Sequence, residues 1–206
     1  LDTSHNDTPT EASRPFDKGH AGFVLSEGAA VIVIEKLSHA LARGATPLAI
    51  AAGYGTSADA YHLTAGSPDG AGAQVAMNQA IRSAGLRPDD IGYVNAHATS
   101  TEVGDNAEIN GIRAVFGDRG QSLAVSSTKS ATGHMLGAAG AIEAVFSILA
   151  LRHQMLPPTL NLHDPEEVAK QFDLVPLEAK PKTLKHALSN SFGFGGVNAS
   201  LVFSAV

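Results

Sequence analysis

LAVSSTKSATGHMLGAAGAIEAVFSILALR, residues 123–152, contains a short apolar run, a glycine-rich turn and a second, longer apolar run. The run Leu123–Ser126 predicts a strand, and Gly137–Arg152 predicts a helix in which Glu143 is the lone acidic residue. A helix that is apolar on all sides is buried. Its free N–H groups and positive dipole end are expected beside His134, in the turn. This strand–turn–helix unit predicts a layered α/β domain.

Similar units flank this stretch on both sides. The apolar spacing predicts strands at 48–53, 91–96, 187–191 and 199–203, and helices at 72–84 and 105–116. Strands that alternate with helices are typical of an α/β fold with parallel strand pairs and helical cover. Nearer the N-terminus, Gly22–Leu25 and Ala29–Glu35 predict two more strands, and Leu37–Arg43 predicts a short helix. The continuous apolar run Val31–Ile34 favours a strand that is buried on both faces.

Composition narrows the classes of function. The 206 residues include no cysteine, which excludes disulfides, thiolate metal sites and a thiol nucleophile within the chain. The net charge of −6 disfavours nucleic acid and anionic membranes as partners. The sequence contains no run of 18 apolar residues, so no membrane span is predicted. Residues 1–17 are polar and predict no signal peptide, and the lack of an initial methionine suggests a fragment.

Polar residues follow three of the predicted strands, where ligands gather in open α/β sheets. Two of these segments lead into His97 and His134, in consecutive strand-to-helix connections. A single histidine there would more often be structural, but two neutral imidazoles aimed at one point can donate N–H bonds to a developing oxyanion. A metal site is not expected, because the sequence offers no third ligand at suitable spacing and no H-E-x-x-H motif.

Lys129, which follows the strand Leu123–Ser126, allows two interpretations. It is either a solvated surface lysine or a buried one, and a buried ammonium needs a carboxylate partner. Glu108 is the candidate partner, although Asp105-x-x-Glu108 also fits a helix capping box. Ser126-x-x-Lys129 matches the serine β-lactamase pattern, but the accompanying S-D-N and K-T-G motifs are absent.

The last two predicted strands are joined by a glycine-rich loop that contains Phe192 and Phe194. In the simplest interpretation the loop is a hairpin turn whose glycines adopt positive φ. Two phenylalanines among mobile glycines also suit the lining or gate of an apolar channel.

Three segments together resemble the β-ketoacyl-acyl carrier protein synthases, elongation-type condensing enzymes of the thiolase superfamily. They are Asn95–Thr101, Ser126–Gly140 and Asn190–Asn198. The resemblance implies a thiolase-like fold. Residues 46–206 would be the C-terminal βαβαβαββ half of a five-layer αβαβα architecture, and residues 1–45 would be the loop and closing strands that end the N-terminal half.

The resemblance also implies a reaction, the decarboxylative Claisen condensation of malonyl-acyl carrier protein with an acyl thioester in fatty-acid elongation. His97 and His134 would be the catalytic histidines, and Lys129 would order the site, supported by Glu108 and Asp105. The implied substrate-binding residues are Thr99 and Thr101, which would bind the phosphopantetheine arm, and the gate Phe194 with Phe192 behind it. No cofactor of its own is implied, because phosphopantetheine arrives on the acyl carrier protein.

Synthases of this family use a cysteine nucleophile in the first half. The chain alone is therefore expected to be inactive in condensation and to require a missing N-terminal half, with a homodimer as the full enzyme. The implied location is cytoplasmic, or mitochondrial or plastid, because organelle-type members share Ala98. Val197 and Ala65 depart from the usual hydroxyl-bearing residues. Two alternatives are a non-catalytic partner like a chain-length factor, and a module that only binds the pantetheine arm.

Overall fold

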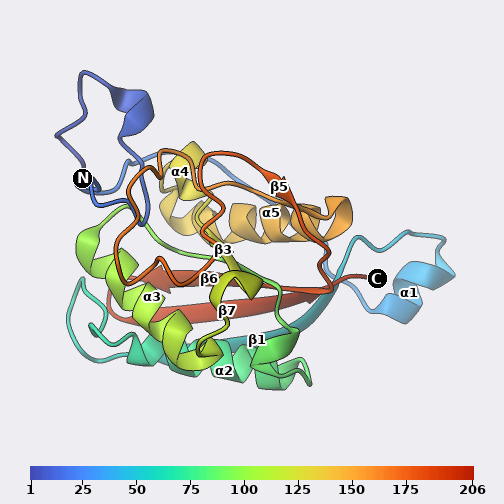
Figure 1. Ribbon diagram of the computed structural model, residues 1–206. Coiled ribbons are helices and arrows are strands. Elements are labelled where there is room, and N and C mark those ends of the chain that lie inside the picture. Colours follow the sequence, from blue (N-terminus) through green and yellow to red (C-terminus); the bar gives the residue numbers. More distant parts are fainter.

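The computed structural model describes residues 1–206 and is built around a mixed sheet of five strands (Figure 1). These strands are β1 (Ile50–Ala58), β2 (Tyr93–Asn95), β3 (Ala124–Ser126), β6 (His186–Gly193) and β7 (Val197–Ser204). Their order is β1-β7-β6-β2-β3. Strand β2 runs parallel to both β3 and β6, whereas β7 runs antiparallel to β6 and β1. The predicted sheet with parallel pairs is confirmed.

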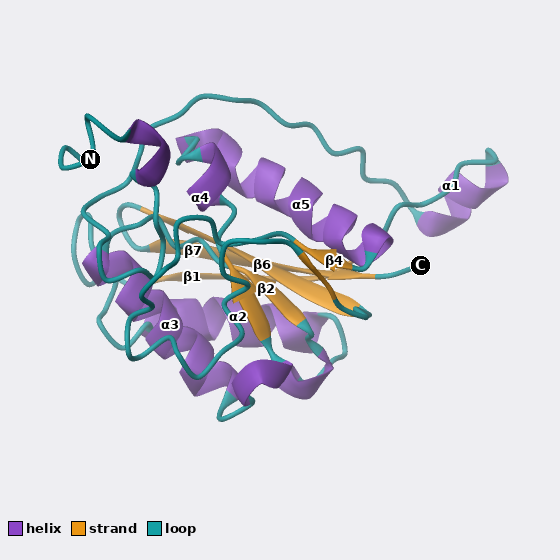
Figure 2. Ribbon diagram, turned by 45° about the horizontal axis from the view of Figure 1, so that its top comes forward, coloured by secondary structure: helices purple, strands orange, loops and turns teal.

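Helices cover both faces of the sheet (Figure 2). Helices α2 (Ala71–Ser83) and α3 (Glu102–Phe116) lie on one face, and α5 (Ala139–His153) lies on the other. The chain from β1 to β7 therefore follows the expected βαβαβαββ order, with small elements added. These are α4 (Lys129–Thr132), the antiparallel pair β4 (Met155–Leu156) and β5 (Lys180–Pro181), and single 3-10 turns at 88–90, 120–122 and 136–138. Before β1 lie α1 (Leu37–Ala42) and a 3-10 turn at 9–11.

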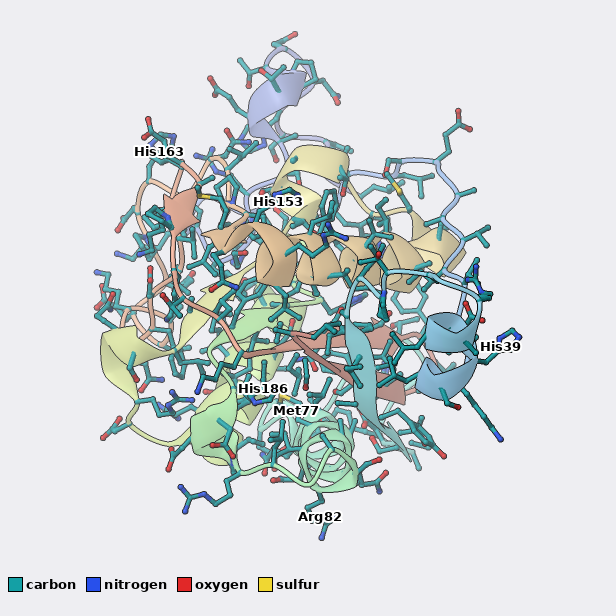
Figure 3. All side chains as sticks on the ribbon, turned by 90° about the vertical axis from the view of Figure 1, so that its right-hand side faces the viewer. His39, Met77, Arg82, His153, His163 and His186 are labelled. Atoms are coloured by element: carbon teal, nitrogen blue, oxygen red, sulfur yellow. The ribbon has the colours of Figure 1, made fainter.

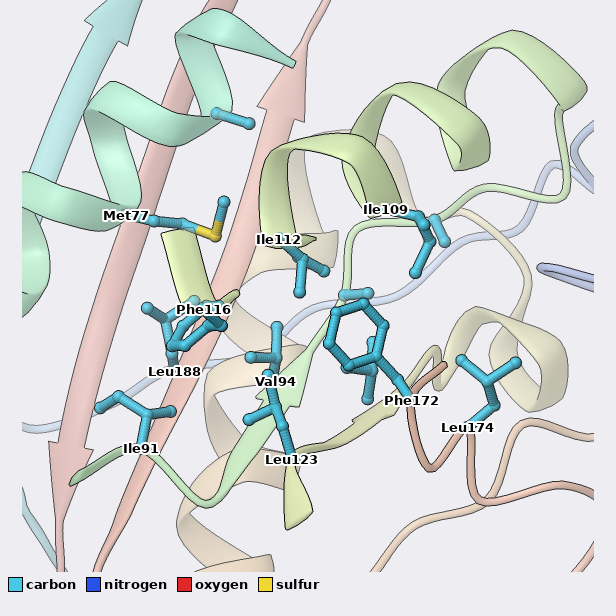
Figure 4. Close-up of a cluster of buried hydrophobic side chains, with 14 of the residues drawn as sticks. Met77, Ile91, Val94, Ile109, Ile112, Phe116, Leu123, Phe172, Leu174 and Leu188 are labelled. Carbon is cyan, nitrogen blue, oxygen red and sulfur yellow. The ribbon is translucent and has the colours of Figure 1, made fainter. Parts of the chain in front are cut away.

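Each face of the sheet has its own hydrophobic core. Beneath α2 and α3, Met77, Ile112 and Phe116 pack against Val94 and Leu188 of the strands (Figure 4). On the opposite face, a second cluster of buried side chains includes Ala144 and Leu151 of α5. It also includes Tyr93 of β2 and Phe203 of β7. Because the central strands are covered on both sides, all three residues of β2 are buried and all three of β3 as well. Because both strands are enclosed in this way, their carboxyl ends are held in fixed positions.

The two strands expected before residue 36 are not formed, and this prediction is wrong. Gly22–Leu25 makes only an isolated bridge, between Leu25 and His134, and Ala29–Glu35 is an extended segment without strand pairing. Within that segment, the side chains of Val31, Val33 and Ile34 are 90%, 81% and 77% exposed. A strand needs a neighbour to pair with, and no strand of this chain lies beside the segment as it passes over α5 to α1 (Figure 2).

Two helices also differ from the prediction, α3 in where it begins and α5 in how far it is buried. Helix α3 begins at Glu102 rather than at Asp105, so Asp105 lies inside its first turn. Helix α5 is not buried on all sides: Glu143 and Ser147 are buried, but Leu149 is 40% exposed. By length and composition the segment Leu136–His153 could cross a membrane, with a mean hydropathy of 1.3. In this structure α5 instead packs on the sheet as a core helix.

Candidate active site

A cleft of about 630 Å³ opens where the parallel strands β2, β3 and β6 end. The three segments predicted to converge do so. The expected site residues that line the cleft are His97, Thr99, Thr101, Glu108, His134, Phe192 and Phe194. Lys129 lies behind the cleft wall and is 1% exposed, so the interpretation as a solvated surface lysine is wrong.

His97 and His134 face one another across the inner end of the cleft. Their ring centroids are 5.2 Å apart, and the ring planes meet at 83°. Phe192 packs against His97 and Phe23 against His134, each with its ring centroid 5.7 Å from that of the histidine. Neither imidazole forms a hydrogen bond with another protein group, and the Nδ1 atoms of both are buried without a partner. Both rings therefore keep their hydrogen-bonding capacity for a ligand.

The backbone around His134 is held by the first segment of the chain. The N–H of His134 donates to the carbonyl oxygen of Val24 at 2.7 Å, and the N–H of Ser26 donates to the carbonyl oxygen of His134 at 3.1 Å. Gly133 adopts φ +68°, and a Cβ there would lie 2.9 Å from Oγ of Ser26. Glycine is required at 133 both by the left-handed conformation and by this close approach.

The partner of Lys129 is Glu143, not Glu108. Nζ of Lys129 hydrogen-bonds to Oε1 of Glu143, and each residue is about 1% exposed. Burial raises the pKa of Glu143, and the nearby ammonium of Lys129 opposes this shift. The sequence did carry a signal for this pair, because a lone carboxylate on an apolar helix is stable only beside a cation.

Burial and the ammonium of Lys129 together lower the pKa values of the two histidines. Burial, and then the positive charge of Lys129, lower the pKa of His134 to about 4. Burial, followed by Lys129 and His134, holds the pKa of His97 well below its usual value. Both imidazoles are therefore neutral near pH 7, and each carries one N–H to donate.

Glu108 fixes the loop that carries His97. Its carboxylate accepts hydrogen bonds from the N–H groups of His97 at 3.0 Å and Ala98 at 2.7 Å, and from Nδ2 of Asn190 at 2.9 Å. Burial raises the pKa of Glu108 to about 7, while the Asn190 hydrogen bond and these N–H groups act in the other direction. The capping box with Asp105 is not formed. Glu108 supports the site through the His97 backbone, and Asn190 is a further supporting residue that sequence reasoning missed.

Asp105 shapes the next part of the same loop. Its Oδ1 lies 2.9 Å from the N–H of Thr99, 3.2 Å from that of Ser100 and 3.4 Å from that of Thr101. Its Oδ2 accepts from the N–H of Phe16 at 3.0 Å. Wrapped in this way, the loop places Thr99 and Thr101 in the cleft wall with their hydroxyl oxygens 3.0 Å apart.

The two phenylalanines of the β6–β7 turn occupy different positions. Phe192 is half-buried against His97, whereas Phe194 is 71% exposed and lines the outer part of the cleft. The turn is tied to residues 59–63, because the N–H of Gly195 donates to the carbonyl oxygen of Leu63 at 2.7 Å. Ala65 also lines the cleft but offers no hydroxyl, and Val197 is 60% exposed. No group of three or more His, Asp or Glu side chains is arranged to hold a metal ion.

Comparison with known proteins gives consistent matches along the whole chain. Residues 48–163 match the profile "Beta-ketoacyl synthase, C-terminal domain", and residues 1–40 match the N-terminal domain of the same family. Over 99% of its length the chain is 52% identical to 3-oxoacyl-[acyl-carrier-protein] synthase 2 of Vibrio harveyi, of which it covers 49%. Over its full length it is 53% identical to the mitochondrial 3-oxoacyl-[acyl-carrier-protein] synthase of Arabidopsis thaliana, of which it covers 45%.

A solved structure shows the same architecture. It is a type II PKS acyl-carrier protein in complex with its ketosynthase, and it superposes with a TM-score of 0.94 at 34% identity. The match covers 97% of this chain and 49% of that one. The chain thus spans about half the length of the curated relatives it matches.

Proposed function

The chain belongs to the β-ketoacyl synthase family and has its thiolase-like fold, and we propose that it supplies the His97–His134–Lys129 part of the site of a 3-oxoacyl-acyl carrier protein synthase. The observation that carries this proposal is the pair of neutral imidazoles, 5.2 Å apart in the cleft and free of protein hydrogen bonds. Two such donors suit a reaction in which negative charge develops on an oxygen.

The proposed reaction has two bond-making events. The cysteine sulfur attacks the acyl thioester, so a new S–C bond forms, the S–C bond to the carrier's phosphopantetheine breaks, and the carrier leaves as a thiol with the proton of the cysteine. The malonyl thioester then loses CO₂, and the electron pair of the broken C–C bond moves onto the thioester carbonyl oxygen as an enolate. His97 and His134 donate N–H bonds to that oxygen. The enolate carbon then attacks the acyl-cysteine carbonyl, a C–C bond forms, and the cysteine leaves as a thiolate.

The remaining residues support these two donors. Burial, and after it the positive charge of the Lys129 ammonium, keep both imidazoles neutral, and Glu143 holds that ammonium in place. The Thr99 and Thr101 hydroxyls suit the amides of a phosphopantetheine arm that enters from an acyl carrier protein. Phe194, at the outer end of the cleft, is placed to gate the arm or the acyl chain.

The nucleophile in this proposal comes from outside the chain, which has no cysteine. A Cys-bearing N-terminal half would complete the site, with residues 1–45 as its end and 46–206 as the C-terminal half. Val31, Val33 and Ile34 form an exposed apolar surface that such a half would cover. On its own the chain would not catalyse condensation, and the complete enzyme would be a homodimer. Relatives from both bacteria and a plant mitochondrion fit a cytoplasmic or an organelle location.

Complementation tests the proposal. The chain is co-expressed with the N-terminal half of the Vibrio harveyi synthase, and condensation of malonyl- and acyl-acyl carrier protein is assayed. We expect product from the pair, none from either half alone, and none when the partner's cysteine is replaced by alanine. A stable pair that binds the carrier protein without condensation would contradict the proposal and favour a chain-length-factor-like partner or a pantetheine-binding module.

A further inference from the structure

His20 lies between two carboxylates in the interior of the protein. Its side chain is 3% exposed, with Nδ1 3.2 Å from Oδ2 of Asp105 and Nε2 3.7 Å from Oε1 of Glu166. A neutral imidazole carries one N–H, whereas the imidazolium carries two. Only protonated His20 can donate toward both carboxylates at once.

The first of these carboxylates is the one that shapes the cleft loop. Asp105 holds the backbone N–H groups of Thr99, Ser100 and Thr101 on one oxygen, and its other oxygen faces His20 and the N–H of Phe16. The proton on His20 therefore neutralises the group on which that loop is folded. The reaction scheme above gives His20 no role.

The charges around His20 favour the protonated form. Burial lowers the pKa of His20, but the hydrogen bond and the charge of Asp105, followed by the charges of Glu166 and Glu102, outweigh it, so the pKa is raised. On its own segment the neighbouring charges are paired elsewhere, Arg14 with Asp17 at 3.2 Å and Lys18 with Asp164 at 3.1 Å. When His20 loses its proton, Asp105 and Glu166 are left without a cation between them.

We propose that protonated His20 is a positioning residue that holds the Thr99–Thr101 loop in the conformation that receives the pantetheine arm. This inference rests on the proposed function for the identity of the arm, but not for the coupling between His20 and the loop. Burying a carboxylate without a neutralising cation costs free energy. When His20 is deprotonated, the loop lowers this cost by moving Asp105 toward water. Deprotonation therefore loosens the loop without touching His97 or His134.

Amide hydrogen exchange tests the coupling directly. Protection factors of the Thr99, Ser100 and Thr101 amides are measured in the wild-type protein from about pH 6 to 9, and the titration of His20 is followed by NMR. We expect protection to fall about tenfold for each unit by which the pKa of His20 is raised, over the pH range in which His20 titrates. Protection that is independent of pH across that range overturns the proposal.

Two substitutions sharpen this test. His20→Arg keeps a permanent cation with a fork of donors, so the loop should stay protected at every pH. His20→Gln removes the charge, so protection should be low throughout. His186→Gln is the matched control. His186, labelled in Figure 3, is the first residue of β6, at the opposite end of the strand from the cleft, and it hydrogen-bonds Oγ of Ser204. The wild-type series needs no substitution and decides the question even where His20→Gln does not fold.

Kinetics on the complete synthase connect the loop to the substrate. In His20→Gln, KM for malonyl-acyl carrier protein should rise about tenfold with little change in kcat, since only binding of the arm is weakened. His20→Arg should restore KM. If His20 changes the protection of the loop but KM stays the same, the positioning role is refuted, while the proposed synthase function is unaffected. If condensation is absent altogether, the exchange data still report on the coupling.

Discussion

The rings of His97 and His134 meet nearly edge to face, with centroids 5.2 Å apart and planes at 83°. The parallel pair β2–β3 sets this distance, because Asn95 is in register with Ser126 and the two connections leave the sheet side by side. The backbone bonds to Val24 and Ser26 hold the connection that carries His134, and the Glu108 carboxylate holds the connection that carries His97. The two donors are fixed before any ligand arrives.

Replacing either histidine by alanine should reduce decarboxylation of malonyl-acyl carrier protein by the complete synthase. In the proposed reaction each ring is one of two donors to the enolate oxygen, and loss of one such donor typically lowers the rate ~10²–10³-fold. The measurement is release of CO₂ under single-turnover conditions for His97→Ala and His134→Ala. His153→Ala, at the exposed end of α5, is the control. Decarboxylation at the wild-type rate in either variant would refute the assigned roles.

The neutral state of His134 should make the protein less stable in acid. The pKa is about 4 in the folded protein, against about 6.5 for an ordinary histidine. Between these values the unfolded chain binds more protons than the folded one, so stability falls as the pH drops through that window.

Thermal unfolding of wild type and His134→Gln between about pH 7 and 4 checks this expectation. The wild-type Tm should fall more steeply, because glutamine does not titrate. Glu108, whose pKa is raised to about 7, contributes a slope of the opposite sign, but it does so in both proteins and cancels in the difference. Parallel curves would show that His134 is not held neutral by the fold.

Breaking the Lys129–Glu143 pair should destabilise the protein strongly. Removing one member of a buried ion pair typically costs about 3–5 kcal/mol, because the other charge is left buried without a partner. Lys129→Met and Glu143→Leu should each lower the free energy of unfolding by this order, and the double variant should recover most of the loss. Denaturant unfolding of the wild type, the two single variants and the double variant measures these free energies. Additive losses would mean that the two side chains are not coupled.

Adding a methyl group at position 104 should weaken substrate binding through Thr101. A Cβ on Gly104 would lie 2.6 Å from Oγ of Thr101, so the hydroxyl must move. In the complete synthase, Gly104→Ala should raise KM for carrier-protein substrates several-fold with little change in kcat.

Thr101→Ala provides the control for this effect. With the hydroxyl absent, the nearest remaining atom of the side chain is 4.0 Å away, which leaves room for the added Cβ. Gly104→Ala should therefore have no further effect on KM in a Thr101→Ala background. An equal rise in KM in both backgrounds would place the cause elsewhere in helix α3.

Local patterns predicted the units that are complete within the chain. The apolar spacing of residues 72–84 gave α2 within one residue at each end, and the strands predicted at 91–96 and 123–126 contain β2 and β3, which are shorter. All three elements bury apolar side chains against parts of the same chain, so the pattern and the structure report the same burial.

Features that depend on distant or absent neighbours were not predictable in this way. The run at 31–34 is as apolar as a central strand, but no strand of this chain pairs with it. The sequence predicted Glu108 as the partner of Lys129, which is wrong, because the packing of α5 on the sheet brings Glu143 to the lysine instead. The role of His20 likewise depends on Asp105 and Glu166, which lie 85 or more residues away.

The backbone bonds between residues 24–26 and His134 bear on how synthases can be recombined. Main-chain donors and acceptors are the same whatever the side chains, so exchanging gene halves near codon 45 between related enzymes preserves both bonds. The approach of Ser26 to Gly133 is different, because a Cβ at position 133 would lie 2.9 Å from Oγ of Ser26, so it depends on which residues meet there. A working hybrid therefore has to inherit a small residue at 26 together with the glycine at 133, one from each parent.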